Sequence, residues 1–117
     1  MSFKFEKLLI WQKAMDLAEE IHELTKKFPK EELFNLTSQS NRSADSIALN
    51  IAEGSISQTS PEQHRFLGYA IRSIAEVVTC LYKAKRRKYI SQEEFDKNYK
   101  DCFDLMNMTI GFKKNMN

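Results

Sequence analysis

Apolar residues recur at every third or fourth position in four long segments of this chain, and only about three to eight residues separate one segment from the next. This spacing places the apolar side chains on one face of an α-helix. Short connections make each helix antiparallel to the one before it. The pattern therefore predicts an all-α fold, an antiparallel up-down-up-down four-helix bundle that forms one domain over residues 1–117.

The predicted helices cover residues of about 8–27, 36–53, 61–88 and 92–113. Residues that interrupt helices are scarce, since the chain has 3 glycines and 2 prolines. Phe28 and Pro29 are expected to end the first helix, because the residue before a proline is disfavoured in the helical conformation.

Polar residues and one glycine mark other helix ends. Thr37 is a candidate N-cap of the second helix, and Gly54 is a candidate C-terminal cap. Ser60 is expected to cap the third helix. Ser91 and Glu94 have the spacing of a capping box at the start of the fourth helix.

Two of the predicted apolar faces contain large side chains that are expected to be buried. The face of the first helix consists of Trp11, Ala14, Met15, Ala18, Ile21, Leu24 and Phe28. The face of the fourth helix consists of Phe95, Tyr99, Cys102, Phe103, Met106 and Ile110.

The net charge of +2 is too small to indicate a nucleic-acid-binding protein by itself, but the charge is uneven. Residues 1–60 carry 7 basic and 9 acidic side chains, and residues 61–117 carry 11 and 7. No apolar run approaches the length of a membrane span, and no signal-peptide pattern is present. A cytoplasmic protein that does not contact membranes is therefore expected.

A second, polar stripe runs along the predicted second helix, formed by Gln39, Arg42, Ser46, Asn50 and Glu53. In an antiparallel pair of helices joined near residues 55–60, Arg42 should face Glu76, with Ser73 nearby. We therefore expect an interhelical ion pair between Arg42 and Glu76 within a polar network. Two roles are open for this network: it fixes helix register or a subunit interface, or it binds a ligand.

Five cations lie within six residues at the end of the third helix: Lys83, Lys85, Arg86, Arg87 and Lys88. The bundle topology brings three more to the same end: Lys26, Lys27 and Lys30. Such a cluster can bind the phosphates of RNA or DNA. It can also be a solvated surface that complements the helix dipole. Tyr82 and Tyr89, placed among these cations, could stack on bases or serve only in packing.

Catalytic and metal-binding patterns do not occur in this sequence. Cys80 and Cys102 are expected to be small buried side chains, neighbours near the turn between the last two helices, and too few for a zinc site. The sequence lacks phosphate-binding glycine loops, HExxH and CxxC pairs. We therefore expect no enzymatic activity, no cofactor and no metal.

The chain resembles a known family through residues spread over nearly its whole length. The most specific part is the run Asn50-Ile51-Ala52-Glu53-Gly54, which Ser46-Ile47 precedes. The other matching positions are Phe5, Leu8, Trp11-Gln12, Phe28-Pro29, Leu36-Thr37-Ser38-Gln39, Arg42, Phe66-Leu67, Ala70, Ser73 and Glu76. With these residues the chain resembles the bacterial four-helix-bundle proteins called 23S rRNA intervening-sequence proteins, which are similar to the accessory proteins of diversity-generating retroelements.

This resemblance implies an antiparallel bundle that assembles into a homopentameric ring without enzymatic activity. It also implies binding to RNA or DNA, with better support in the retroelement branch. The chain departs from the usual pattern at Arg72, where a glycine normally precedes Ser73, and at Asn35, where glycine is usual. The sequence therefore predicts a non-catalytic oligomer that binds RNA or DNA. The alternative is a scaffold that presents its ring to a partner protein such as a reverse transcriptase.

Overall fold

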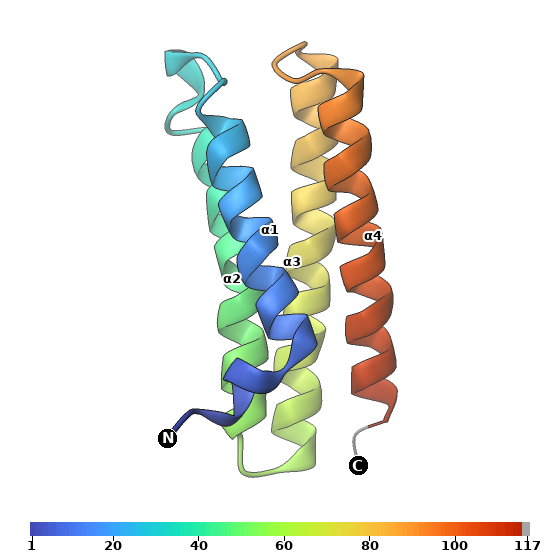
Figure 1. The fold of residues 1–117 in the computed structure, drawn as a ribbon. Helices are drawn as coiled ribbons and strands as arrows, with labels where there is room; N and C mark the ends of the chain where they lie inside the picture. Colours follow the sequence, from blue (N-terminus) through green and yellow to red (C-terminus); the bar gives the residue numbers. More distant parts are fainter. Residues whose placement is uncertain (116–117) are drawn as a thin grey trace.

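The computed structural model describes residues 1–115 and contains four long helices that alternate in direction, so the predicted up-down-up-down bundle is confirmed (Figure 1). Two short 3-10 helices, η1 and η2, precede the first and second long helices. The elements in chain order are η1 (Lys4–Lys7), α1 (Leu9–Thr25), η2 (Lys30–Glu32), α2 (Leu36–Ile56), α3 (Ser60–Arg86) and α4 (Gln92–Lys114).

One hydrophobic core runs along the bundle between the four long helices. Every sequential pair of long helices is in contact, and α1 also contacts α4, which closes the bundle. The largest side chains of this core that are fully buried are Ile21, Leu36, Ile47, Ile51, Leu67, Ile74, Val77 and Leu105. The ends of α1 and α3, η2 and the connection from α3 to α4 lie together at one end of the bundle (Figure 1).

Two large side chains that the periodicity places on buried faces are exposed instead. Met15 of α1 and Phe103 of α4 both lie on the surface, and Phe103 is 56% exposed. Trp11 is half-buried, and its ring packs on the ring of Phe5 from η1 at a centroid distance of 5.2 Å. The predicted apolar faces were therefore wider than the stripe that each helix actually buries.

Two of the predicted helix starts differ from the structure. The helix α2 begins at Leu36 with Asn35 as its N-cap, so Thr37 lies inside the helix and not at its cap. The hydroxyl of Thr59, not that of Ser60, accepts the capping hydrogen bond from the Glu62 N–H. Sequence patterns locate such ends only to within one or two residues.

Gly54, which was predicted to end α2, lies inside the helix where α2 packs against α3. The helix continues past Gly54 to Ile56, and Gly54 is buried. A Cβ at this position would lie 3.3 Å from the Cβ of Phe66 in α3. Glycine therefore allows the close approach of α2 and α3, and the predicted C-terminal cap at Gly54 was wrong.

The helix α3 ends in a Schellman motif that contains a lysine where glycine is usual. The Tyr89 N–H donates to the Ala84 carbonyl oxygen (2.9 Å), and the Lys88 N–H donates to the Lys85 carbonyl oxygen (3.0 Å). Lys88 has a φ of 64°, in the left-handed region that side chains disfavour.

Replacing Lys88 by glycine is expected to stabilise the fold by about 0.5–1 kcal/mol. Relief of the left-handed conformation is partly offset by the larger entropy of glycine in the unfolded chain. Urea denaturation measures the effect. A Lys88→Ala variant loses the same charge but keeps the unfavourable φ, so equal stabilisation by both variants would contradict the backbone explanation.

Candidate functional site

The end of the bundle that carries η2 and the α3–α4 connection holds all eight cations that the sequence predicted there (Figure 1). The structure divides them into two groups. Among the described residues 1–115, four have a charged or aromatic partner and four have no such partner. This division decides which of them can bind a ligand without first breaking an internal contact.

Three of the partnered cations form ion pairs, and one lies on an aromatic ring. Arg87 pairs with Glu32 at an N–O distance of 3.0 Å, and Lys85 lies 4.5 Å from the centroid of the Phe95 ring. The other two ion pairs are Lys26–Glu23 and Lys27–Glu94. Arg87, Lys85, Lys26 and Lys27 therefore contribute less free positive charge than the sequence suggests.

The remaining four cations at this end are Lys30, Lys83, Arg86 and Lys88. Each is exposed, and within residues 1–115 none of them forms an ion pair. Three of them belong to one segment at the end of α3 and its connection to α4. These four residues, called the free basic cluster below, are the cations that the structure leaves available for phosphates.

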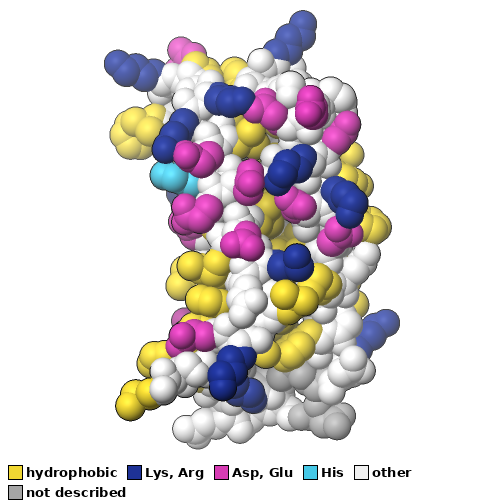
Figure 2. Space-filling view, in the orientation of Figure 1, with side chains coloured by type: hydrophobic (Ala, Val, Ile, Leu, Met, Phe, Trp, Pro, Cys, Tyr) yellow, Lys and Arg dark blue, Asp and Glu magenta, His cyan; other side chains and the backbone are white. Residues whose placement is uncertain are grey.

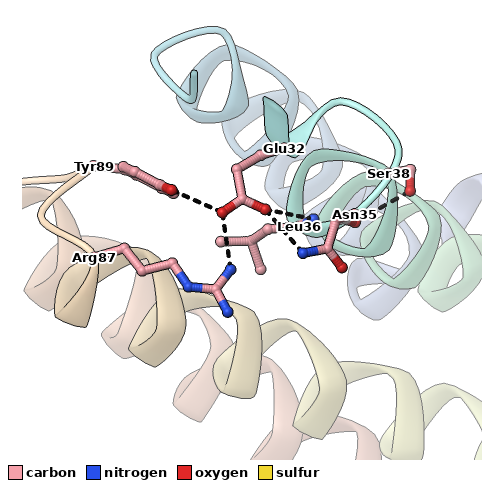
Figure 3. Close-up of polar contacts among 6 residues, drawn as sticks. All are labelled: Glu32, Asn35, Leu36, Ser38, Arg87 and Tyr89. Carbon is pink, nitrogen blue, oxygen red and sulfur yellow. Dashed lines mark hydrogen bonds and ion pairs between the residues drawn. The ribbon is translucent and has the colours of Figure 1, made fainter. Parts of the chain in front are cut away.

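Glu32 is the most connected polar side chain at this end, and Figure 3 shows its contacts. Its Oε2 accepts hydrogen bonds from the Tyr89 hydroxyl (2.7 Å) and from Nη1 of Arg87 (3.0 Å). Its Oε1 accepts from Nδ2 of Asn35 (3.0 Å) and from the Leu36 N–H (3.3 Å). This buried carboxylate therefore caps α2 and joins η2 to the α3–α4 connection.

The pattern of the sequence does not indicate this role of Glu32. The one local signal was an acidic residue just before the start of a helix, which favours the helix dipole. Its partners Arg87 and Tyr89 lie 55 and 57 residues away, so the periodicity of the sequence could not select them. The ring of Tyr89 also packs on Phe28, with centroids 5.4 Å apart, so Tyr89 has a packing role.

The hydrogen bond from Tyr89 lowers the pKa of Glu32 below its ordinary value, with help from Leu36 and Arg87 and against the effect of burial. The same hydrogen bond raises the pKa of the Tyr89 hydroxyl. Glu32 is therefore ionised in the folded protein at neutral pH. Its contribution to stability is complete above the pKa of an unfolded glutamate and disappears as the pH falls through the lowered value.

Replacing Glu32 by glutamine is expected to lower the urea midpoint at pH 7, because an amide NH₂ cannot accept the hydrogen bonds from Tyr89 and Arg87. The difference from the parent protein should shrink at pH 3, because the unfolded chain takes up a proton there more readily than folded Glu32, whose pKa is lowered. Urea titrations at both pH values measure this. Glu31→Gln, at the exposed neighbouring residue, is the matched control; a pH-independent difference, or equal effects of the two variants, would refute the assignment.

The polar stripe of α2 borders a surface groove of about 620 Å³ between α2 and α3. Arg42 and Glu76 both line this groove, yet no ion pair joins them within the described part of the chain, so that prediction was wrong. The interhelical contact is instead a hydrogen bond from the Ser46 hydroxyl to the Ser73 hydroxyl. Asn50 donates to the Ser46 carbonyl oxygen within α2 (2.8 Å).

The members of the predicted network therefore differ in their surroundings. Ser73 is buried, whereas Ser46 and Asn50 are half-buried. Gln39, Arg42, Glu53 and Glu76 are exposed in the single chain. The exposed members are available for contact with another molecule.

The two cysteines face different parts of the core. Cys80 lines the groove between α2 and α3 and packs near Ile21 and Ser40, so it points toward α1 and α2 and not toward α4. Cys102 of α4 is fully buried, and burial raises the pKa of its thiol to about 12. Both thiols are free and buried, as expected for small core side chains.

A second groove, of about 550 Å³, separates α1 from α4. Figure 2 shows charged side chains of both signs along this face. The groove residues Asp16, Glu20, Asp101 and Asp104 are acidic, and Lys97 joins the two helices by contacting Glu20 at 3.4 Å. Across residues 1–115, no group of three or more His, Cys, Asp or Glu side chains is arranged to hold a metal ion. In the same residues, no helix is long and apolar enough to span a membrane.

Together these features define a class of protein, an antiparallel four-helix bundle with a cluster of free cations at one end. A comparison with family models identifies the group within this class. Residues 6–111 match the model of the 23S rRNA-intervening sequence protein family, so the chain belongs to this family.

Solved structures support the same fold. The chain is similar to the crystal structure of a protein of unknown function from the S23 ribosomal protein family of Bacteroides thetaiotaomicron VPI-5482. The TM-score is 0.85 and the identity is 24%, over 92% of this chain and 100% of that chain. No significant match was found among curated proteins.

Proposed function

We propose that this protein is a non-catalytic homo-oligomer that binds RNA or DNA through the phosphates, with the free basic cluster as its contact surface. The observation that carries this proposal is that four exposed cations at one end of the bundle have no ion-pair partner among the described residues. Arg87 and Lys27 hold the same end together through Glu32 and Glu94.

Oligomerisation would increase the affinity for nucleic acid above that of a single basic cluster. A ring, a pentamer by family resemblance, would present the free basic cluster once per subunit. Several clusters on one nucleic acid then bind much more tightly than one cluster alone. Exposed apolar side chains on α2, Leu49 and Ile56, are candidates for the subunit contact.

A salt titration of the parent protein tests the proposal. The dissociation constant for a fluorescein-labelled nucleic acid should rise steeply with salt, because binding releases counterions from the phosphates. For four phosphate contacts per subunit, the logarithm of the association constant should fall with the logarithm of salt concentration with a slope of about −3.6 for a duplex and about −2.8 for a single strand, and more steeply if several subunits bind. Absence of binding at low salt by an intact oligomer would refute nucleic-acid binding.

The second candidate function is that of a scaffold for a partner protein. It rests on the groove between α2 and α3, where the exposed side chains of Arg42 and Glu76 lie without an ion-pair partner in the described chain. Lys83 of the free basic cluster lines the same groove, so Arg42→Gln and Glu76→Gln, which place no new charge beside Lys83, distinguish the two functions. They should leave nucleic-acid binding by the free basic cluster intact and abolish binding of a protein partner at this groove.

A further inference from the structure

A ladder of aromatic rings crosses the face formed by α3 and α4, next to the free basic cluster. Phe95, Tyr99 and Phe103 follow one another at four-residue spacing on α4, with ring centroids 5.6 and 6.4 Å apart. Their planes differ by only 30° and 20°. Tyr82 of α3 meets the edges of Phe95 and Tyr99, with centroids 4.9 and 6.3 Å away.

The rings of this ladder range from buried to exposed. Phe95 is buried and Tyr99 is half-buried, whereas Tyr82 is 44% exposed and Phe103 is 56% exposed. A single exposed ring is ordinary on a protein surface. Here two exposed rings contact the same third ring, so together they form one aromatic platform.

Positive charges lie beside this aromatic platform, and they would attract a polyanion. Lys85 lies over the ring of Phe95, and the free cation Arg86 lies one helical turn from Tyr82 on the same side of α3. Two nearby carboxylates of α4 have partners, although Asp96 keeps its negative charge because its partner Gln92 is neutral. Asp104 pairs with Lys100 at 2.7 Å, and Asp96 accepts a hydrogen bond from Gln92 at 2.8 Å.

We propose that Tyr82 and Phe103 stack on the bases of a single-stranded nucleic acid whose phosphates contact Arg86. This inference rests on the proposed function and specifies its ligand. Single strands expose the faces of their bases, whereas a duplex hides those faces inside its stack. Aromatic rings beside a basic track therefore select single strands with little dependence on sequence.

The test compares binding of a fluorescein-labelled 20-nucleotide single strand, as DNA and as RNA, with binding of the matched duplex at low salt. The parent protein should bind the single strand at least about tenfold more tightly. Tyr82→Ala and Phe103→Ala should each weaken single-strand binding about tenfold and change duplex binding little.

Three further variants separate stacking from other contacts. Tyr82→Phe keeps the ring and should bind like the parent. Phe103→Leu keeps an apolar side chain without a ring and should be as weak as Phe103→Ala. Tyr69→Ala removes an exposed ring of α3 outside the ladder and should leave binding unchanged.

The outcomes distinguish this inference from the proposed function. Equal binding of single strands and duplex, unaffected by the ring variants but sensitive to salt, would overturn stacking and leave phosphate binding in place. No binding of either nucleic acid would overturn both. Loss of assembly by folded Phe103→Ala, measured as mass in solution, would show that this face is a subunit contact and overturn stacking.

Discussion

Reversing the charge of three cations in the free basic cluster, with Lys83→Glu, Arg86→Glu and Lys88→Glu together, is expected to weaken nucleic-acid binding by a factor of about 10²–10³ at 0.1 M salt. Each lost phosphate contact removes the release of roughly one counterion, which is worth close to tenfold at this salt concentration. Fluorescence anisotropy with labelled RNA and DNA measures the change.

The control variant carries the same change in net charge at other positions. Lys4→Glu, Lys7→Glu and Lys13→Glu lie in η1 and the first half of α1, away from the free basic cluster. This variant should bind within a few-fold of the parent, since its substitutions act only through the long-range field. Equal losses in the two triple variants would show that total charge, and not the basic end of the bundle, controls binding.

Replacing Ile47 by alanine is expected to destabilise the fold by about 3–4 kcal/mol. Ile47 lies in the middle of α2 with 0% of its surface exposed, so the shorter side chain leaves a cavity in the core. This loss is a large fraction of the stability of a typical domain. Urea denaturation at pH 7 measures it as a lower midpoint with an unchanged slope.

The same helix offers a matched control. Ile56→Ala removes the same atoms from the last residue of α2, where Ile56 is 65% exposed. It should change the stability of the monomer by less than about 0.5 kcal/mol. A comparable cost at both positions would show that helix propensity, and not burial, dominates the effect.

Predictions from neighbouring residues hold in part, since the caps predicted at Thr37, Ser60 and Gly54 were wrong. The capping box of Ser91 and Glu94 is present, because both partners lie within one turn of the same helix. The predicted partner of Arg42 was wrong. Ser46 of α2 contacts Ser73 of α3, whereas Arg42 and Glu76 form no ion pair within residues 1–115. Which side chains meet depends on the rotation of each helix about its axis, because successive residues point about 100° apart.

At the candidate site, the sequence predicted the position of the cations but not their partners. The sequence placed eight cations at one end of the bundle, since helix order and short connections determine which ends meet. It could not tell that Arg87 binds Glu32 or that Lys85 lies on Phe95. Those contacts depend on how helices far apart in the sequence rotate about their axes when the core forms.

The sequence alone therefore determined the helical class, the number and direction of the helices, and the concentration of positive charge at one end, because each depends on local periodicity and connection length. Only the tertiary structure decided which cations are free, that Glu32 joins η2 to the α3–α4 connection, and that Phe103 faces solvent. The reason is physical. A helix with a broad apolar face can turn about its axis, and close contact with its neighbours selects the stripe that it buries.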